Sequence, residues 1–319
     1  MVELEFSKKI DVMTPILSAV VIDEDTAIFL SYREDNMHYQ LVYVKEEKVE
    51  ILPLDYTEKY YSIADIPILF ASNKQFGIIK NKSELFVYSI EKEIFECIAI
   101  EQVNTLPQRF RLQGNVPISN CSNLPICFSG DSLGNDTRYI AYLVFDWENK
   151  KAYWEGWNSI STDLLLHHTD KQYPPKIDAV MCKDDELYIF TSGGQITSVN
   201  KWGMDYYALI KSNKAGIITQ ILLDSGDLHT IDHKKRGVNG LFTTSQEYLV
   251  LTPVFKNDEW KGKQRLFSMV TQELLTISFP RGLGKQPQVI EHIGDCFWIY
   301  LKESNEIVIC KEKTNSIDS

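Results

Sequence analysis

The chain has 319 residues with 33 basic and 44 acidic side chains, so its formal net charge at pH 7 is −11. Hydrophobic residues make up 44% and charged residues 24% of the chain, an ordinary globular composition that excludes disordered and collagen-like proteins. The acidic balance argues against nucleic acid or an anionic membrane as a direct partner, because their phosphates would be repelled. It favours a basic protein instead.

The expected compartment is the cytoplasm. The N-terminal residues lack the basic region, apolar region and small-residue cleavage site of a secretory signal. No apolar run approaches the ~20 residues that a membrane-spanning helix needs. The six cysteines are scattered and never form a Cys-x-x-Cys motif, which argues against a disulfide framework.

Short runs rich in Val, Ile, Tyr and Phe, bounded by polar turns, predict β-strands along the whole chain. Residues 16–55 contain four such runs joined by tight acidic turns, which is the pattern of an antiparallel meander. Similar units are expected at 67–100, 125–157, 176–223, 240–279 and 287–312. The last unit has only three strands, whereas residues 2–9 form an extra strand that precedes the first unit.

A four-stranded unit that recurs every ~50 residues is typical of a β-propeller. Pairing residues 2–9 with the last unit would close the ring and remove a free sheet edge. We therefore expect one all-β domain over residues 1–319, a six-bladed β-propeller of four-stranded antiparallel blades closed by the N-terminal strand. A seven-bladed ring is the rival, because the second and fourth units carry long insertions.

The segment Gly130-Asp131-Ser132-Leu133-Gly134 matches the Gly-x-Ser-x-Gly nucleophile elbow of hydrolases. The elbow requires a helix after the serine, but here another strand-like run follows. Gly, Asp, Ser and Asn are also ordinary hairpin residues. We therefore expect no catalytic residue, with Ser132 as the minority candidate in a propeller hydrolase.

No cofactor and no metal site are expected. His229 and His233 loosely match a metallo-hydrolase run, but the spacing and first ligand differ, and a polar turn is the simpler interpretation. Gly282-Leu283-Gly284-Lys285 lacks the other residues of a phosphate loop. A metal-dependent, lactonase-like activity using axial carboxylates stays open as an alternative, as does a scaffold subunit of a larger complex.

Large aromatic residues lie among polar, turn-forming residues, where we expect exposed rings that could anchor a partner protein. These partner-binding candidates are Trp154, Trp157, Trp202, Tyr206 and Trp260. The alternative is that the rings brace contacts between blades. Residues 1–100 carry 18 acidic and 10 basic side chains, and Glu34 and Asp35 are the candidates for steering a cationic partner. An acidic surface that serves only solubility is the other interpretation.

In architecture and charge the chain resembles the cytosolic immunity proteins that accompany bacterial polymorphic toxins, including those of contact-dependent growth inhibition. The resemblance covers the whole chain in outline, and no short motif supports it, so no family residue is transferred. It implies tight 1:1 capture of a cognate toxin domain, often a cationic nuclease, with occlusion of the toxin's active site. We therefore expect a non-enzymatic, protein-binding propeller.

Overall fold

The computed structural model describes residues 1–33, 38–57, 67–71, 75–81, 83–89, 92–102, 126–131, 137–146, 149–161, 176–184, 186–198, 201–213, 215–224, 238–253, 264–284 and 286–313. Every regular element in these residues is a β-strand, which confirms the predicted all-β class. Antiparallel pairing of consecutive strands divides the elements into groups, numbered here in chain order.

Groups 1 to 3 occupy the first half of the chain. Group 1 comprises β2 (Ile16–Val21), β3 (Thr26–Arg33), β4 (His38–Lys45) and β5 (Lys48–Thr57). Group 2 comprises β6 (Ile68–Ala71), β7 (Gln75–Ile79), β8 (Glu84–Ser89) and β9 (Ile94–Gln102). Group 3 comprises β10 (Ile126–Asp131), β11 (Thr137–Asp146) and β12 (Lys151–Ser161).

Groups 4 to 6 follow, and the last of them includes the first strand of the chain. Group 4 comprises β13 (Lys176–Lys183), β14 (Glu186–Ser198), β15 (Lys201–Asn213) and β16 (Ile218–Asp224). Group 5 comprises β17 (Val238–Phe242), β18 (Tyr248–Pro253), β19 (Arg265–Ser268) and β20 (Leu274–Ser278). Group 6 comprises β21 (Pro287–Ile293), β22 (Cys296–Leu301), β23 (Glu306–Glu312) and β1 (Val2–Asp11).

Two short parallel pairings join the outer strands of neighbouring groups. β1 pairs with β20 through Val2 and Glu3, which merges groups 5 and 6 into one eight-stranded sheet. β12 pairs with β9 through residues 152–154, which merges groups 2 and 3 into a seven-stranded sheet. Groups 1 and 4 remain separate four-stranded sheets.

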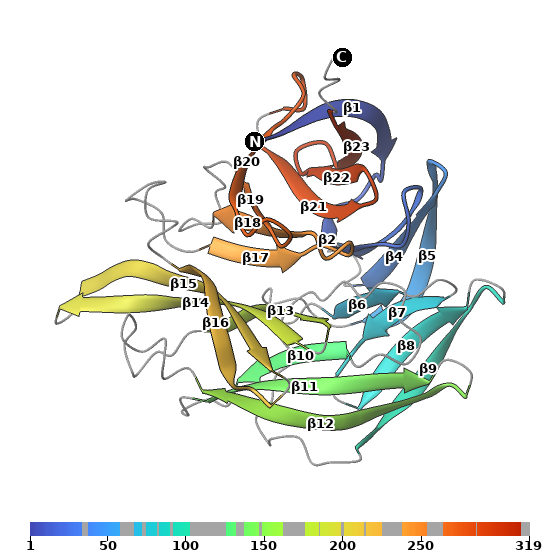
Figure 1. Ribbon diagram of the computed structural model, residues 1–319. Coiled ribbons are helices and arrows are strands. Elements are labelled where there is room, and N and C mark those ends of the chain that lie inside the picture. Colours follow the sequence, from blue (N-terminus) through green and yellow to red (C-terminus); the bar gives the residue numbers. More distant parts are fainter. Residues whose placement is uncertain are drawn as a thin grey trace.

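The groups follow one another around the molecule in chain order (Figure 1). The first strands of neighbouring groups lie side by side: β2 contacts β6 and β21, and β13 contacts β10 and β17. Each of six hydrophobic clusters combines residues of two neighbouring groups, and one of them joins group 6 back to group 1. The core is therefore a circle of packed interfaces between neighbouring groups, because each group buries both faces of its strands. We call each of these interfaces a seam.

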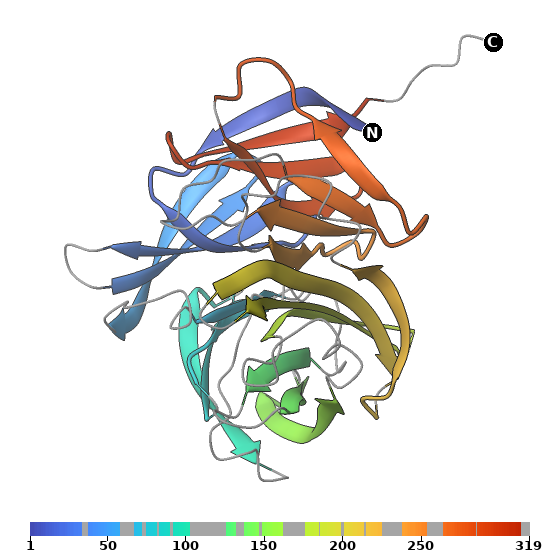
Figure 2. The same ribbon diagram turned by 90° about the vertical axis from the view of Figure 1, so that its left-hand side faces the viewer.

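The N-terminal strand closes this circle, as the sequence predicted. β1 runs antiparallel to β23, with Leu4 opposite Glu312 and Asp11 opposite Glu306 (Figure 2). A β-bulge between Phe6 and Lys8 shifts the alternation of its side chains. Even-numbered side chains before the bulge consequently point into one seam, and those after the bulge point into the other.

The consequence of the bulge is visible in the buried residues of β1. Val2 and Leu4 belong to the cluster between groups 5 and 6. Ile10, together with Val12 directly after the strand, belongs to the cluster between groups 6 and 1. Without the extra residue, all four side chains would lie on one face of the strand. One N-terminal strand thus contributes to two seams.

Candidate protein-binding surface

Acidic turns from groups 1 and 6 meet at one end of the ring. The β2–β3 turn contains Asp23, Glu24 and Asp25, which are all exposed. The backbone N–H of Glu46, in the β4–β5 turn, donates a hydrogen bond of 3.1 Å to the carbonyl of Asp25. The Glu24 carboxylate lies over the β21–β22 turn, so close that a Cβ added to Gly294 would lie 2.5 Å from Glu24 Oε1.

An aromatic row crosses the adjacent seam between groups 1 and 2. Tyr43 of β4 stacks on Phe76 of β7, with ring centroids 5.7 Å apart and an interplanar angle of 15°. Phe76 packs against Tyr88 at 4.9 Å, and Tyr88 packs against Phe95 at 4.8 Å. Phe76 is completely buried, whereas Tyr43 and Phe95 are only half-buried. The two ends of the row therefore reach solvent.

Carboxylates flank this row. Glu50 is the cross-strand partner of Tyr43, and Glu93 lies in the turn before β9. Burial raises the pKa of the Tyr43 hydroxyl, and the nearby charges of Asp23 and Glu50 raise it further. The pKa of Tyr88 is likewise raised by burial and by Glu50 and Glu93. Asp23, Glu50 and Glu93 therefore lie close enough to the row to act on the hydroxyls of its two tyrosines.

We call this region the acidic face. It consists of seven carboxylates from groups 6, 1 and 2, each of which is exposed: Asp23, Glu24, Glu46, Glu47, Glu50, Glu93 and Asp295. Asp25 is left out because it forms an ion pair with Lys8. Lys45 and Lys48 flank the β4–β5 turn and Lys92 lies beside Glu93, but the carboxylates of the acidic face outnumber these three lysines. Carboxylates beside half-buried aromatic rings suit Lys and Arg side chains, which bind acids by charge and rings by cation–π attraction.

The structure corrects the expected position of Trp154. This residue is 0% exposed and lies in the cluster between groups 2 and 3, so it braces a seam and cannot anchor a partner. The neighbouring Glu and Gly suggested a turn, but β12 continues to Ser161. Trp154 alternates there with the half-buried Tyr153, which is the normal period of a strand.

For the remaining candidate residues, the structure gives the backbone position of three and does not describe the other four. Trp157 lies in β12, and Trp202 and Tyr206 lie in β15, so these three are strand residues rather than turn residues. Their side chains are outside the described part of the structure. Glu34, Asp35, Ser132 and Trp260 lie wholly outside the described residues. Sequence reasoning missed Tyr43, Phe76, Tyr88 and Phe95, whose only signal was an aromatic residue close to an acidic turn in successive strands.

A buried polar cluster joins groups 5 and 6. Glu291 of β21 is 0% exposed and accepts three hydrogen bonds. They come from the Thr244 N–H at 2.5 Å, the Thr244 hydroxyl at 2.6 Å and the His292 N–H at 2.8 Å. Desolvation nevertheless raises the pKa of Glu291 to about 7. The two donors of Thr244 bind the β17–β18 turn to β21, which is a structural role.

His292 extends the same cluster. Its Nδ1 lies 2.8 Å from the Ser245 hydroxyl, and its ring packs edge-on against Tyr248 and beside Phe297. Burial lowers the pKa of His292 to about 4. The Ser245 hydroxyl also accepts a hydrogen bond from the Glu247 N–H, so it is part of the turn structure. Serine and histidine meet here across the contact between groups 5 and 6, and the histidine ring is buried against Tyr248 and Phe297.

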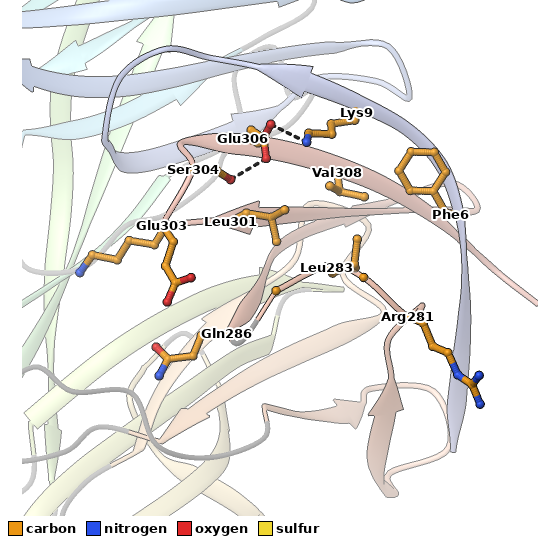
Figure 3. A pocket seen from close by; sticks show the side chains of 13 residues that line it. Phe6, Lys9, Arg281, Leu283, Gln286, Leu301, Glu303, Ser304, Glu306 and Val308 are labelled. Atoms are coloured by element: carbon orange, nitrogen blue, oxygen red, sulfur yellow. Dashed lines mark hydrogen bonds and ion pairs between the residues drawn. The ribbon is translucent and has the colours of Figure 1, made fainter.

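A groove of about 510 Å³ lies beside β1, between the β20–β21 loop and the β22–β23 turn (Figure 3). Its apolar lining includes Phe6, Leu283, Leu301 and Val308. Gly282 and Gly284 of the loop have φ angles of +93° and +83°, the left-handed region that favours glycine. These two glycines let the loop turn tightly along the sheet.

Within the described ranges, no group of three or more His, Cys, Asp and Glu side chains is placed to hold a metal ion. No helix that could cross a membrane occurs in those ranges either.

No protein-family profile and no curated protein sequence matches the chain. Among solved structures, an α-L-arabinanase from Penicillium chrysogenum, complexed with arabinobiose, is similar at a TM-score of 0.54 and 11% identity, covering 97% of this chain and 98% of that one. BamB from Moraxella catarrhalis is similar at 0.44 and 12%, covering 93% and 85%. An oligogalacturonate lyase from Vibrio parahaemolyticus is similar at 0.46 and 10%, covering 97% of both chains.

The arabinanase is a β-propeller, and the ring of β-sheets described above belongs to the same class of fold. The protein is therefore an all-β propeller. At 11% identity the similarity to the arabinanase extends to the fold alone, because one fold supports many unrelated functions.

Proposed function

We propose that the protein is a non-enzymatic β-propeller of six blades that binds a basic partner protein through the acidic face. The blades correspond to the six strand groups, and β1 supplies the outer strand of the sixth. The partner's Lys and Arg side chains would lie against Glu50, Glu93 and the neighbouring carboxylates, and one or more would cover the exposed ends of the aromatic row.

The observation that carries this proposal is the position of the aromatic row under the acidic turns. Tyr43 lies opposite Glu50 in the β4–β5 hairpin, and Phe95 follows Glu93 by two residues. An acidic surface that served solubility alone would not need aromatic side chains at its centre. Rings surrounded by charged groups are the usual composition of an interface hot spot, where the rings hold the partner and the charges steer it.

The resemblance to cytosolic immunity proteins supplies the class of partner. A nuclease toxin domain is cationic because it binds nucleic acid, so it is complementary to an acidic propeller. We propose 1:1 capture of such a domain in the cytoplasm, with its active site covered. Direct binding of nucleic acid or of a membrane is not part of this function.

The test uses a basic nuclease domain encoded next to this protein, with association and dissociation rates measured by biolayer interferometry over ~0.05–0.5 M salt, a range in which the Debye length falls severalfold. Glu50→Lys should slow association at least ~10-fold at low salt, because it reverses a steering charge. Glu273→Lys makes the same charge change on an exposed residue of group 5 and is the matched control.

Tyr43→Ala should act on dissociation instead, and should cost ~2 kcal/mol of binding free energy without unfolding the ring. Association that ignores both salt and Glu50→Lys would contradict the proposal. So would turnover of acyl esters, lactones or arabinan by the purified protein, and loss of such activity in Ser132→Ala would establish the hydrolase alternative.

A further inference from the structure

The N-terminal strand has a free backbone edge at the outer rim of the ring (Figures 1 and 2). One edge of β1 pairs with β23 from Leu4 to Asp11, whereas the other edge pairs with β20 only at Val2 and Glu3. Beyond Glu3, this second edge has no strand partner among the described residues. An open edge of this kind is a template for an added strand.

The hydrogen bonds at the two ends of β1 show which of its backbone groups point toward β23. The Glu3 carbonyl accepts a hydrogen bond of 2.8 Å from the Lys313 N–H. At the other end, the Val12 N–H donates a hydrogen bond of 3.2 Å to the Asn305 carbonyl. The N–H and C=O groups of successive residues in an antiparallel strand point to opposite edges. The residues that point to the free edge can therefore be counted from each end.

Four residues of β1 direct their N–H and C=O groups to the free edge. They are Leu4 and Phe6, counted from one end, and Lys9 and Asp11, counted from the other. The bulge places one extra residue between the two pairs, so the outward residues are two, three and two positions apart. A regular strand has outward groups at every second position and would not match this spacing along its whole length.

The spacing is the same when it is read in either direction. A second copy of β1 that runs antiparallel would therefore meet the first in register, with Phe6 of each copy opposite Lys9 of the other and Leu4 opposite Asp11. The bulges of the two copies would face each other at the two-fold axis, so that neither interrupts the pairing. β20 occupies the edge only up to Glu3, which lies just beyond the paired stretch.

We propose that two copies of this protein form a dimer through the free edges of β1, paired antiparallel about a two-fold axis between Ser7 and Lys8. The contact is isologous, which is the commonest arrangement in protein dimers. It joins the group 6 strands of the two copies into one continuous sheet. The dimer does not depend on the partner proposed for the acidic face, and capture there becomes 2:2, with one partner domain for each chain.

The side chains of β1 suit this pairing. Phe6 is 54% exposed, although it is a large apolar side chain in the middle of a strand. Phe6 and Lys9 both line the groove beside β1, so they lie on the same face of the strand (Figure 3). In the dimer, the Lys9 side chain of one copy covers the Phe6 ring of the other by apolar and cation–π contact. On the opposite face, Glu5 lies diagonally across from Lys8 of the other copy.

Net charge also permits two copies to meet at this strand. β1 contains three acidic and two basic residues, which is close to balance in a chain with a net charge of −11. The acidic face could not associate with its own copy, because its carboxylates would repel one another. A contact of one strand edge is small, so we expect a weak dimer rather than an obligate one.

Sedimentation velocity of the full chain over ~1–500 μM measures the association, and the dissociation constant should be about 0.1 mM or tighter. Phe6→Lys should weaken the dimer at least ~10-fold, because it removes the covered ring and places Lys opposite Lys9 twice in each dimer. Phe6→Glu removes the same ring but places a carboxylate opposite Lys9. Its dimer should therefore be at least ~5-fold tighter than that of Phe6→Lys.

Val270→Lys is the matched control, because Val270 is 72% exposed and lies outside β1. Its dimer should be as stable as that of the parent protein. Thermal melts of each variant show that the monomer is folded, so that a change in association is not a loss of structure.

Disulfide trapping tests the register directly. Phe6→Cys and Lys9→Cys are each made in a Cys97→Ser background, which removes an exposed native thiol. Under mild oxidation, a mixture of the two proteins should form a cross-linked dimer, because directly opposite strand residues lie within the Cα separation of a disulfide. Either protein alone should form far less.

Three results would overturn the proposal. The first is a chain that stays monomeric at ~0.5 mM, well above the expected dissociation constant. The second is equal association of Phe6→Lys and Phe6→Glu, or a loss of association in Val270→Lys, either of which places the contact elsewhere. The third is cross-linking of Phe6→Cys alone as readily as the mixture, which contradicts the two-fold register.

Discussion

Two seams of the ring are built from different chemistry. Between groups 1 and 2, rings stack in a row from Tyr43 to Phe95, and all the acidic groups stay at the solvent rim. Between groups 5 and 6, ionisable and polar side chains are themselves buried, with Glu291 at the centre. The first seam leaves its charges free to meet another molecule, whereas the second uses them internally. The comparison separates a surface that can bind from a cluster that only holds the ring together.

In the second seam, a side-chain amide also takes the place of a neighbouring strand as the hydrogen-bonding partner of a backbone segment. The amide of Gln264 accepts a hydrogen bond of 2.6 Å from the Val289 N–H and donates one of 3.3 Å to the Val289 carbonyl. Val289 lies next to the bulge in β21, where regular pairing is interrupted. Such contacts are directional, so this seam should be more specific in its register and more sensitive to pH than the aromatic seam.

Deleting residues 2–9 should have the largest effect, because it removes two buried apolar side chains and most of the outer strand of group 6. Val2 and Leu4 leave the cluster between groups 5 and 6, and β23 becomes an open edge. We expect a loss of at least ~4 kcal/mol in the free energy of unfolding from the lost apolar burial alone, together with aggregation. Urea unfolding and size-exclusion chromatography measure both effects. Glu5→Gln, an exposed change in the same strand, is the control, and a deletion variant as stable as the parent would show that β1 does not close the ring.

The aromatic seam should respond strongly to a single truncation. Phe76 is fully buried and touches the rings on both sides, so Phe76→Ala should cost ~3–5 kcal/mol of folding stability. The cost should be the same from pH 5 to pH 8, because no ionisable group changes its burial. Ile94→Ala in the same group is 47% exposed before truncation and should cost far less. A pH-dependent cost for Phe76→Ala would mean that the two seams are not separable.

The seam between groups 5 and 6 should make the folding stability depend on pH. The pKa of Glu291 is about 7 in the folded protein and near 4.5 when exposed, so folding takes up a proton between these values and Glu291 lowers stability as pH rises. The pKa of His292 is about 4 when folded and near 6.5 when exposed, so folding releases a proton and His292 raises stability over about pH 4–6.5. Between pH 4.5 and 6.5 the two contributions cancel.

Glu291→Gln should break this cancellation. The amide oxygen can accept the N–H groups of Thr244 and His292, and the amide NH₂ can donate to the Thr244 hydroxyl, so the hydrogen bonds survive. Stability of the variant should then rise steadily with pH from about 4 to 6.5, as His292 alone requires. His292→Phe should show the converse fall between about pH 4.5 and 7. Urea unfolding at half-unit pH steps measures both, and two flat profiles would contradict the assignment.

Much of the fold could be predicted from the sequence, because strand alternation and acidic turns are local signals. The orphan strand at residues 2–9 and the missing fourth strand of the last unit predicted closure, which the pairing of β1 with β23 confirms. Trp154 was predicted wrongly because its polar neighbours resemble a turn. The direction of its side chain depends on how far β12 continues, which is set by pairing with β11.

The candidate sites were harder to predict for a physical reason. The acidic turns could be recognised, but the row from Tyr43 to Phe95 depends on cross-strand register and on the packing of two separate sheets. Similarly, Thr244 and Glu291 are 47 residues apart, and no motif connects them. Contacts between sheets have no sequence period, so they become visible only in three dimensions.

The pairing of Leu4 with Glu312 has a consequence for synthesis of the protein. β1 is made before the other described strands, whereas its partner β23 is made after them. Until then, residues 2–9 have no β23 to pair with, and Val2 and Leu4 cannot be buried between groups 5 and 6. Joining ends so far apart in sequence is slow, because the entropy of closing the long loop must be overcome before the contacts form. Early strands must therefore wait in a partly folded chain, and a chaperone that shields β1 during translation should raise the yield of native protein.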